Sequence, residues 1–444
     1  MRPPGPLLRP MPIADDPREA AIMRRVGLRL IPFLVTAYLV AVIDRVNVGF
    51  ASLQMNHDLG LTQSAFGLAA GVFFLTYFLL EIPSNLVLQR VGASRWLARI
   101  MISWGLVAGA TAFVVGPTSF LTMRLVLGAA EAGFFPGVIL FLTYWFPSHY
   151  RARMMGLFVL SVPASGIVGS PISGLLLGAE GFLGLHGWQW MFMAEALPAV
   201  LLGIFGLFWL TDGPATAKWL SAEERSWLAA RLQADRAASA SGQVAALPLW
   251  RMLANGRVLL LTLVCAATVT ISAALGIWQP VIIKSFGVGN FQTGLLNAIP
   301  YIAACTAMVL WGRHSDRTLE RVWHNVLPMS AIVVAMVATL FTTNLVVMMV
   351  LLTVIMVGTF APKGPFWALA TEALPASIAA AAIAEINALG SLPGFFASYL
   401  IGAIKDATGS YPVAIMPIAA LCFAGVIGVL FLRPARTGNA MQRG

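Results

Sequence analysis

The chain has 444 residues, of which 59% are hydrophobic and only 10% are charged, far below the roughly one-quarter charged content of a soluble globular domain. This balance excludes intrinsic disorder, collagen-like fibres and disulfide-rich secreted scaffolds, and it predicts a protein that lies mainly in lipid. The 28 Lys and Arg against 18 Asp and Glu give a net charge of +10, but their placement follows membrane topology, so we expect no nucleic acid partner.

Twelve apolar runs follow one another along the chain, and each is long enough to cross a bilayer, which takes about 20 mostly apolar residues. The first run contains Asp44 and Arg45 and lacks the small-residue cleavage site of a signal peptide, so we interpret it as a retained span. The predicted spans cover residues 29–51, 65–88, 95–115, 118–146, 151–178, 187–210, 257–283, 291–312, 322–341, 344–372, 377–402 and 411–432.

Basic residues are divided unevenly between the loops. With the N-terminus inside, 22 of the 28 Lys and Arg lie in inside segments, and the outside loops hold only Lys284 and Lys405. Cytoplasmic loops carry such an excess, which predicts an even number of spans with both termini in the cytoplasm. The four remaining cations lie within spans: Arg45, Arg99, Arg124 and Lys363.

The spans form two sets of six, which suggests a duplication and predicts an all-α membrane protein with two pseudo-symmetric six-helix bundles. The expected divisions are a cytoplasmic tail at 1–28, a first bundle at 29–210, a cytoplasmic linker at 211–256, a second bundle at 257–433 and a cytoplasmic tail at 434–444.

A charged motif repeats after the second and eighth spans, where Arg90 and the pair Asp316 and Arg317 fall. We expect these residues to lie in short cytoplasmic loops and to act in gating, because charges at helix ends and salt bridges can hold two halves in one state and release them in another. Ordinary anchoring of basic loops at the membrane is the alternative interpretation.

Charged residues inside spans are functional candidates, because a charge near the bilayer centre costs about 2.5–3.5 kcal/mol even on insertion scales. At about 1.5 Å per helical residue, Asp44 and Arg124 lie at similar depths in the first and fourth spans. Glu131 is seven residues beyond Arg124 and shares its helical face. Asp44 and Arg45 point about 100° apart, so one can pair with the fourth span while the other faces a cavity. Glu195 lies closer to a span end, where we expect it to be solvated.

Two carboxylates and two guanidiniums at this spacing predict a device that handles protons and anions together. A guanidinium stabilises the charged form of a neighbouring carboxylate, so an anion that occupies the guanidinium favours protonation of the carboxylate. Binding of the anion and uptake of a proton would then be linked. The alternative is a static lattice of ion pairs that only holds the first and fourth helices together.

The second half supplies a different set of polar groups. In the tenth span Pro362 and Pro365 flank Lys363 and should break the helix, and the freed backbone groups are tolerated only next to protein or a water-filled cavity. The eleventh span places Asn387 at mid-depth. A pair of polar, interrupted helices predicts a substrate wall, although Asn387 and Tyr77 of the second span could instead join helices by hydrogen bonds.

Four stretches of the chain, Asp44–Ala51, Arg124–Gly137, Tyr144–Pro147 and Gly364–Trp367, resemble the anion:cation symporter family of the major facilitator superfamily. The resemblance covers nearly the whole chain and implies the major facilitator fold. It also implies that Asp44 and Glu131 occupy the proton-coupling positions and that Arg45 and Arg124 compensate charge or hold a substrate carboxylate. By the same resemblance, Tyr77, Trp367 and Asn387 line the cavity.

The chain departs from the family pattern at several positions. Gln89 stands where an aspartate is usual in the first motif, so the copy at Asp316 and Arg317 is the better candidate for an electrostatic latch. Lys363 adds a cation to the predicted substrate wall, and Glu385 stands where an apolar residue is expected.

The sequence therefore predicts a secondary transporter, not an enzyme, that moves a small organic anion such as a dicarboxylate or a sugar acid together with protons by alternating access. We expect no cofactor or metal, protons rather than sodium as the coupling ion, and a monomer in the bacterial inner membrane, with the lipid bilayer and the anion as partners. The runner-up function is a proton-coupled exporter of amphiphilic or drug-like compounds, which would not need Arg45.

Overall fold

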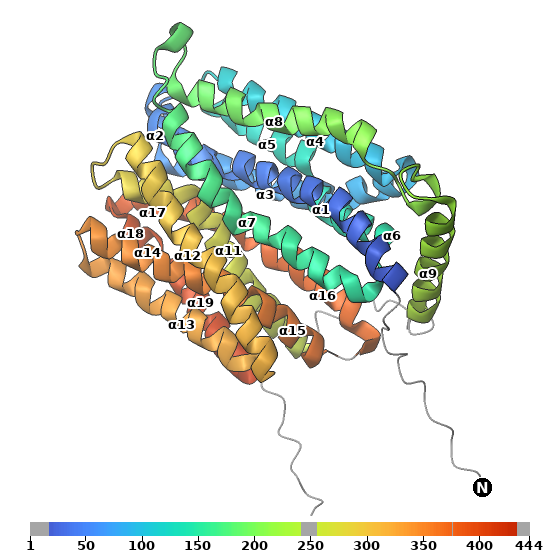
Figure 1. Cartoon of the computed structure of the whole chain (residues 1–444). Coiled ribbons are helices and arrows are strands. Elements are labelled where there is room, and N and C mark those ends of the chain that lie inside the picture. The colour runs from blue at the N-terminus through green and yellow to red at the C-terminus, as the bar shows by residue number, and fades with distance from the viewer. Residues whose placement is uncertain (1–16, 241–254, 375, 433–444) are drawn as a thin grey trace, which may run out of the picture.

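The computed structural model describes residues 17–240, 255–374 and 376–432, and these ranges contain helices and turns without a strand. Figure 1 shows two adjoining groups of helices, with α9 (Ala222–Ala240) across one end of the molecule, which we call the α9 end. The first half holds α1 (Pro17–Val46), α2 (Val48–Asp58), α3 (Gln63–Val91), α4 (Ala93–Ala110), α5 (Pro117–Glu131), α6 (Phe134–Trp145), α7 (Ser148–Leu176) and α8 (Gly187–Trp209). The second half holds α11 (Gly256–Lys284), α12 (Asn290–Thr318), α13 (Val322–Ala338), α14 (Leu345–Phe360), α15 (Lys363–Ala373), α16 (Ala376–Ser391), α17 (Pro393–Thr408), α18 (Tyr411–Ala414) and α19 (Met416–Phe431).

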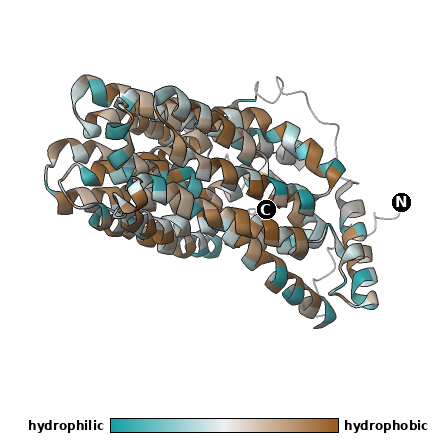
Figure 2. Ribbon diagram, turned by 90° about the horizontal axis from the view of Figure 1, so that it is seen from above, coloured by the Kyte–Doolittle hydropathy of each residue, from teal (hydrophilic) through white to brown (hydrophobic). Residues whose placement is uncertain are grey.

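Twelve helical stretches in the described residues are long and apolar enough to cross a membrane, which confirms the predicted all-α fold with twelve spans. Apolar residues dominate the helices in Figure 2, and polar residues are frequent in α9. The first span begins at Arg18 rather than at residue 29. The helix is longer than its apolar run because Ile22, Met23 and Val26 are buried on one face of this charged first part.

The repeated charged motif lies on helix ends and not in loops, so the predicted loop placement was wrong. Asp316 and Arg317 belong to the last turns of α12, which ends where Leu319 takes a φ of 54°. Arg90 belongs to the last turn of α3, before Gly92 with a φ of 101°. Helical hydrogen bonds continue beyond the apolar run because they satisfy the backbone, while polar side chains there still reach water.

Four spans are interrupted near their middle. The breaks fall at Asn47 between α1 and α2, at Gly133 between α5 and α6, after Phe360 between α14 and α15, and at Leu392 between α16 and α17. The breaks in the tenth and eleventh spans were predicted, and those in the first and fourth were not. Because a broken helix at membrane depth needs protein or a cavity to satisfy its backbone, the four breaks together mark the region where a polar site can form.

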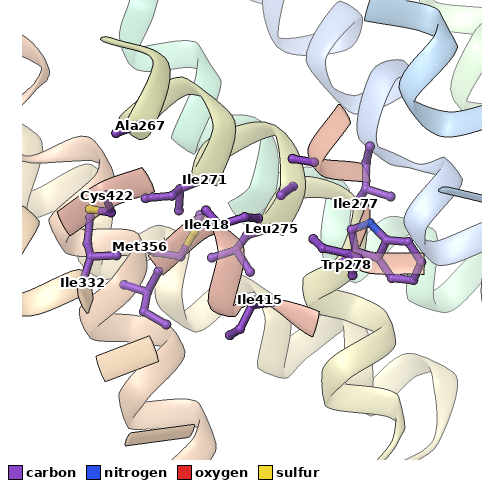
Figure 3. Packing of buried hydrophobic residues seen from close by; sticks show 14 of the residues in the cluster. Ala267, Ile271, Leu275, Ile277, Trp278, Ile332, Met356, Ile415, Ile418 and Cys422 are labelled. Carbon is purple, nitrogen blue, oxygen red and sulfur yellow. The ribbon is translucent and has the colours of Figure 1, made fainter. Parts of the chain in front are cut away.

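An apolar core fills the second half and reaches into the first. Figure 3 shows Ile271, Leu275 and Ile418 among the side chains packed inside the second half. At the edge of this core the ring of Trp278 meets Phe66 of α3 edge to face, with centroids 5.3 Å apart. Aromatic pairs of this geometry add to the energy of apolar burial, so the two halves share packing on this side.

The halves approach most closely at the end opposite α9, where the loops after odd-numbered spans lie. A Cβ atom on Gly67 of α3 would lie 2.3 Å from the carbonyl oxygen of Ser398 on α17. A Cβ atom on Gly294 of α12 would lie 2.4 Å from the carbonyl oxygen of Ser170 on α7, whose hydroxyl accepts a 2.8 Å hydrogen bond from Asn297. These positions leave no space for a side chain, and the molecule is therefore closed at this end.

A carboxylate of the second half also caps a helix of the first half at the closed end. Oδ2 of Asp406 on α17 accepts a 2.8 Å hydrogen bond from the backbone N–H of Ser64, and Oδ1 accepts one of 3.2 Å from that of Gln63. These N–H groups belong to the first turn of α3, which has no intrahelical acceptor for them and carries the positive end of the helix dipole.

Replacing Asp406 with alanine should weaken the closed end. Loss of a capping side chain costs about 0.5–2 kcal/mol, which shifts the equilibrium between closed and open forms of this end by roughly 2- to 30-fold. Spin labels on cysteines placed at the exposed His57 and Ala407 should report a longer-distance population in Asp406→Ala and not in the matched control Lys405→Ala. An unchanged distance distribution would show that Asp406 does not hold this end shut.

Candidate functional site

An ion pair between α1 and α5 lies at the centre of the candidate site. Nη2 of Arg45, one residue before the end of α1, donates to Oε1 of Glu131, the last residue of α5. The side chain of Glu131 is 1% exposed and that of Arg45 is 19% exposed. A buried charge without a partner is strongly destabilising, so the pair explains how both residues are tolerated at membrane depth.

The break after Glu131 depends on one glycine for two separate reasons. Gly133 takes a φ of 88°, which disfavours residues with a Cβ atom, and a Cβ there would lie 2.4 Å from Oγ of Ser84. The break ends α5 directly after the carboxylate and lets α6 start in a new direction. The break thus leaves Glu131 at the end of α5, where Arg45 separates it from the residues that line the central cavity.

Asp44 points away from its neighbour Arg45, as the 100° spacing predicted. Its Oδ2 accepts a 3.0 Å hydrogen bond from Nε1 of Trp104 on α4, and the side chain is 2% exposed. Asp44 is absent from the described lining of the central cavity. The structure therefore brings Arg45, and not Asp44, to Glu131, and the coupling role of Asp44 stays a prediction.

Arg124 is buried two turns before Glu131 on α5, on the same helical face as predicted. Its side chain is 1% exposed, and its Nε and Nη2 atoms have no hydrogen-bond partner in the described part of the chain. The guanidinium carbons of Arg124 and Arg45 lie 5.0 Å and 5.3 Å from the centroid of the Phe73 ring. Phe73 thus contacts both cations, and Arg124 is a second buried cation that does not line the cavity.

A central cavity of about 260 Å³ lies between the two halves. Five of the residues predicted to bind a substrate line it: Arg45, Tyr77, Lys363, Trp367 and Asn387. Glu81 and Ser391 also line the cavity. Five hydroxyl side chains of the wall had no predicted site role: Tyr38, Ser165, Thr268, Ser272 and Tyr301. No single span signals these hydroxyl groups, because they come from four helices and meet only in the folded protein.

Lys363 enters the cavity from the second half at the break of the tenth span. The break follows the prolines, since Pro362 and Pro365 cannot donate the backbone hydrogen bonds that would continue α14. Phe366 N–H bonds instead to the carbonyl of Pro362 at 2.7 Å and starts α15. Nζ of Lys363 lies 4.4 Å from the ring centroid of Phe360, the last residue of α14.

The eleventh span contributes Asn387 but not Glu385 to the cavity. Ser391 donates a 2.8 Å hydrogen bond to the carbonyl of Asn387 where α16 ends. Glu385 is 7% exposed, lies outside the lining, and has no hydrogen-bond partner for either carboxylate oxygen within the described ranges. The two residues point in different directions because positions two apart on a helix are separated by about 200°.

The expectation that Glu195 is solvated was wrong. Its side chain is 6% exposed, and its oxygens accept hydrogen bonds from Ser173 (2.6 Å) and from Asn47 at the break of the first span (2.9 Å). Two donors from other helices replace water. Glu195 lies about 12 Å from the start of α8 at Gly187. This distance along the helix could have indicated that the side chain of Glu195 does not reach the membrane surface.

The predicted gating residues lie at the α9 end, and the network around Asp316 stays within the second half. Nη1 of Arg321 donates to Oδ1 of Asp316 at 2.8 Å, and Nε of Arg321 lies 3.4 Å from Oε1 of Glu372 on α15. Arg317 and Arg90 are exposed. This network connects α12 to α15, the helix that carries Lys363 and Trp367.

Near the first copy of the motif, a carboxylate from after α8 takes the place of the missing aspartate. Oδ1 of Asp212 accepts a 2.8 Å hydrogen bond from the backbone N–H of Ser94, and a Cβ on Gly92 would lie 2.8 Å from Oδ2 of Asp212. The first half therefore has a carboxylate at a helix end although residue 89 is a glutamine and not an aspartate. The gating roles of Arg90, Asp316 and Arg317 stay predictions.

Comparisons with known proteins point to one family and one fold. The family model for the Major Facilitator Superfamily matches residues 34–398. A "Putative tartrate transporter" of Agrobacterium vitis is 48% identical over 93% of this chain and 95% of its own length. The "Putative metabolite transport protein NicT" of Pseudomonas putida is 40% identical over 97% of this chain and 100% of its own length. A "Quinolone resistance transporter" of Acinetobacter baumannii is 41% identical over 92% of this chain and 94% of its own length. The crystal structure of a D-xylose-proton symporter shares the fold, with a TM-score of 0.72, 16% identity, and coverage of 91% of this chain and 97% of that one.

Proposed function

The chain belongs to the Major Facilitator Superfamily and is a multi-pass membrane transporter rather than an enzyme, and from that premise we propose that it moves a small organic anion together with protons. The observation that carries the proposal is the ion pair of the buried Glu131 with Arg45, which lines the cavity. A carboxylate that binds Arg45 from the cavity competes with Glu131 for the same guanidinium. Glu131 then loses its stabilising charge while remaining buried, so it takes up a proton.

Binding of anion and proton is reciprocal in this scheme, because each favours the other through the same residue. Co-transport of a proton removes the electrical cost of importing the anion. With a negative interior, importing a monovalent anion costs about 2.3 kcal/mol per 100 mV, and one proton cancels that cost. Sodium is the less favoured coupling ion, because Arg45 occupies the carboxylate that a sodium ion would need as a ligand.

We propose that the α9 end faces the cytoplasm of a bacterium and that the protein lies in the inner membrane. The excess of Lys and Arg in segments at that end supports this orientation, and the named relatives are bacterial. The close contacts of Gly67 and Gly294 then seal the outer side, so the described form is closed toward the outside. Alternating access requires these contacts to separate when the protein opens outward.

Export of drug-like compounds is the second candidate, and the relative named as a quinolone resistance transporter favours it. The cavity argues for the organic anion instead. Arg45 and Lys363 in its wall favour an anion over the cationic or neutral compounds that such an exporter would carry.

Proton coupling can be measured directly on purified protein in liposomes with a pH dye inside. Adding a transported carboxylate outside, without an imposed gradient, should acidify the lumen, and the signal should vanish on collapsing the pH difference with a protonophore. Protein-free liposomes provide the control for passive entry of the protonated acid. Uptake that leaves the internal pH unchanged and requires sodium would contradict the proposal.

A further inference from the structure

Two cations face the same cavity from opposite halves, and only one of them has a carboxylate partner. Arg45 of α1 is paired with Glu131. Lys363 of α15 lines the same cavity, and among the described side chains no carboxylate lies within ion-pair distance of its Nζ. The ring centroid of Phe360 lies 4.4 Å from Nζ. A half-buried ammonium without a carboxylate partner keeps most of its capacity to attract an anion.

The charged groups on neighbouring elements do not compensate Lys363. On α15 itself, Glu372 is engaged with Arg321. On α16, Glu385 lies outside the cavity lining. Glu81 of α3, in the first half, is the one carboxylate among the described lining residues, and it lies on the opposite wall. Lys363 thus presents an available positive charge to a solute in the cavity.

We infer that the substrate is a short dicarboxylate that contacts both halves at once, with one carboxylate on Arg45 and the other on Lys363. This inference rests on the proposed transport of organic anions and narrows it to one class. A monocarboxylate such as a sugar acid would satisfy Arg45 and leave Lys363 without a counter-charge. Hydroxyl groups on the linking carbons would meet Ser165, Tyr301 and Asn387, which line the same space.

Because the two cations lie on different halves, the second carboxylate of the substrate should also affect how the two halves move during transport. A dianion that bridges Arg45 and Lys363 stabilises any state in which the two walls approach each other, since both contacts improve as the gap narrows. A monoanion of the same shape lacks this differential interaction. We therefore expect the second carboxylate to increase the rate of translocation as well as the affinity.

The test compares diacids with their monoamides, which keep size and shape but lose one charge. Succinate, malate and tartrate are each paired with the corresponding monoamide, and binding to the purified full-length protein is measured by calorimetry, with counterflow in liposomes as the transport measurement. The wild type should bind the transported diacid about 10- to 100-fold more tightly than its monoamide, as expected for one charge-assisted contact. Lys363→Met should abolish this preference by weakening diacid binding alone, and Lys363→Arg should retain most of it.

Lys284→Met is the matched control, because Lys284 donates to the carbonyl of Val288 at the closed end, away from the cavity. It should behave as the wild type. Equal losses for diacid and monoamide in Lys363→Met would overturn the inference and assign Lys363 to the packing of the helix break. Binding of sugar acids but of none of the three diacids would also overturn it and leave the proposed anion transport intact, whereas transport of no carboxylate at all would remove both.

Discussion

Glu131→Gln is expected to abolish uphill accumulation of the substrate while leaving exchange across the membrane in place. Glutamine keeps the size of the side chain and can still accept a hydrogen bond from Arg45, but it cannot take up a proton. Binding and reorientation therefore remain possible, whereas the link to the proton gradient is lost. We expect the accumulation ratio to fall to that of passive equilibration and counterflow to stay within roughly threefold of the wild type.

Two other buried carboxylates provide the comparison. Glu195→Gln alters an acid whose oxygens already have two donors, Ser173 and Asn47, outside the cavity, and accumulation should persist. Asp44→Asn tests the second acid that the sequence assigned to coupling. Accumulation measured with a labelled substrate under an imposed pH gradient distinguishes the three variants, and full accumulation by Glu131→Gln would exclude Glu131 as the coupling residue.

Arg45→Ala should have the second large effect, on both folding and binding. Removing one partner of a buried ion pair costs about 3–5 kcal/mol, because the remaining charge is left uncompensated. The first-half contact for a substrate carboxylate is lost at the same time, and we expect transport to fall by at least about 100-fold. Arg45→Lys should retain part of the activity, since an ammonium supplies charge without the planar fork of the guanidinium.

The double variant Arg45→Ala/Glu131→Gln separates the two effects. Because neither member of the pair is left as a lone charge, its thermal unfolding temperature should recover toward the wild type, while binding of carboxylates remains lost. Thermal unfolding and calorimetric binding on the four members of the cycle give the coupling energy of the pair. Normal carboxylate binding by the double variant would contradict the role of Arg45 and would favour the exporter of drug-like compounds.

Several features of the site follow from the sequence with simple geometry. Spacing along one helix placed Arg124 and Glu131 on a common face and separated Asp44 from Arg45, and the structure confirms both relations. The prolines around Lys363 predicted the break of the tenth span. These predictions succeed because they depend only on the helical repeat and on the backbone chemistry of proline.

Other features required contacts between helices. The sequence suggested that either Asp44 or Arg45 would meet the fourth span, and only the packed structure selects Arg45 for Glu131 and Trp104 for Asp44. Glu195 was misjudged because its donors, Ser173 and Asn47, come from other helices. The break beside Glu131 was missed because it depends on the approach of Gly133 to Ser84.

The amino-acid sequence by itself determined that this protein crosses the membrane twelve times and keeps a small set of charges at depth, because hydropathy and the cost of a buried charge act on each segment independently of its neighbours. Only the tertiary structure decided which charge neutralises which and which cation remains available to a solute. The cost of burial demands a partner for each ion, but the identity of the partner depends on how the helices pack and where they break.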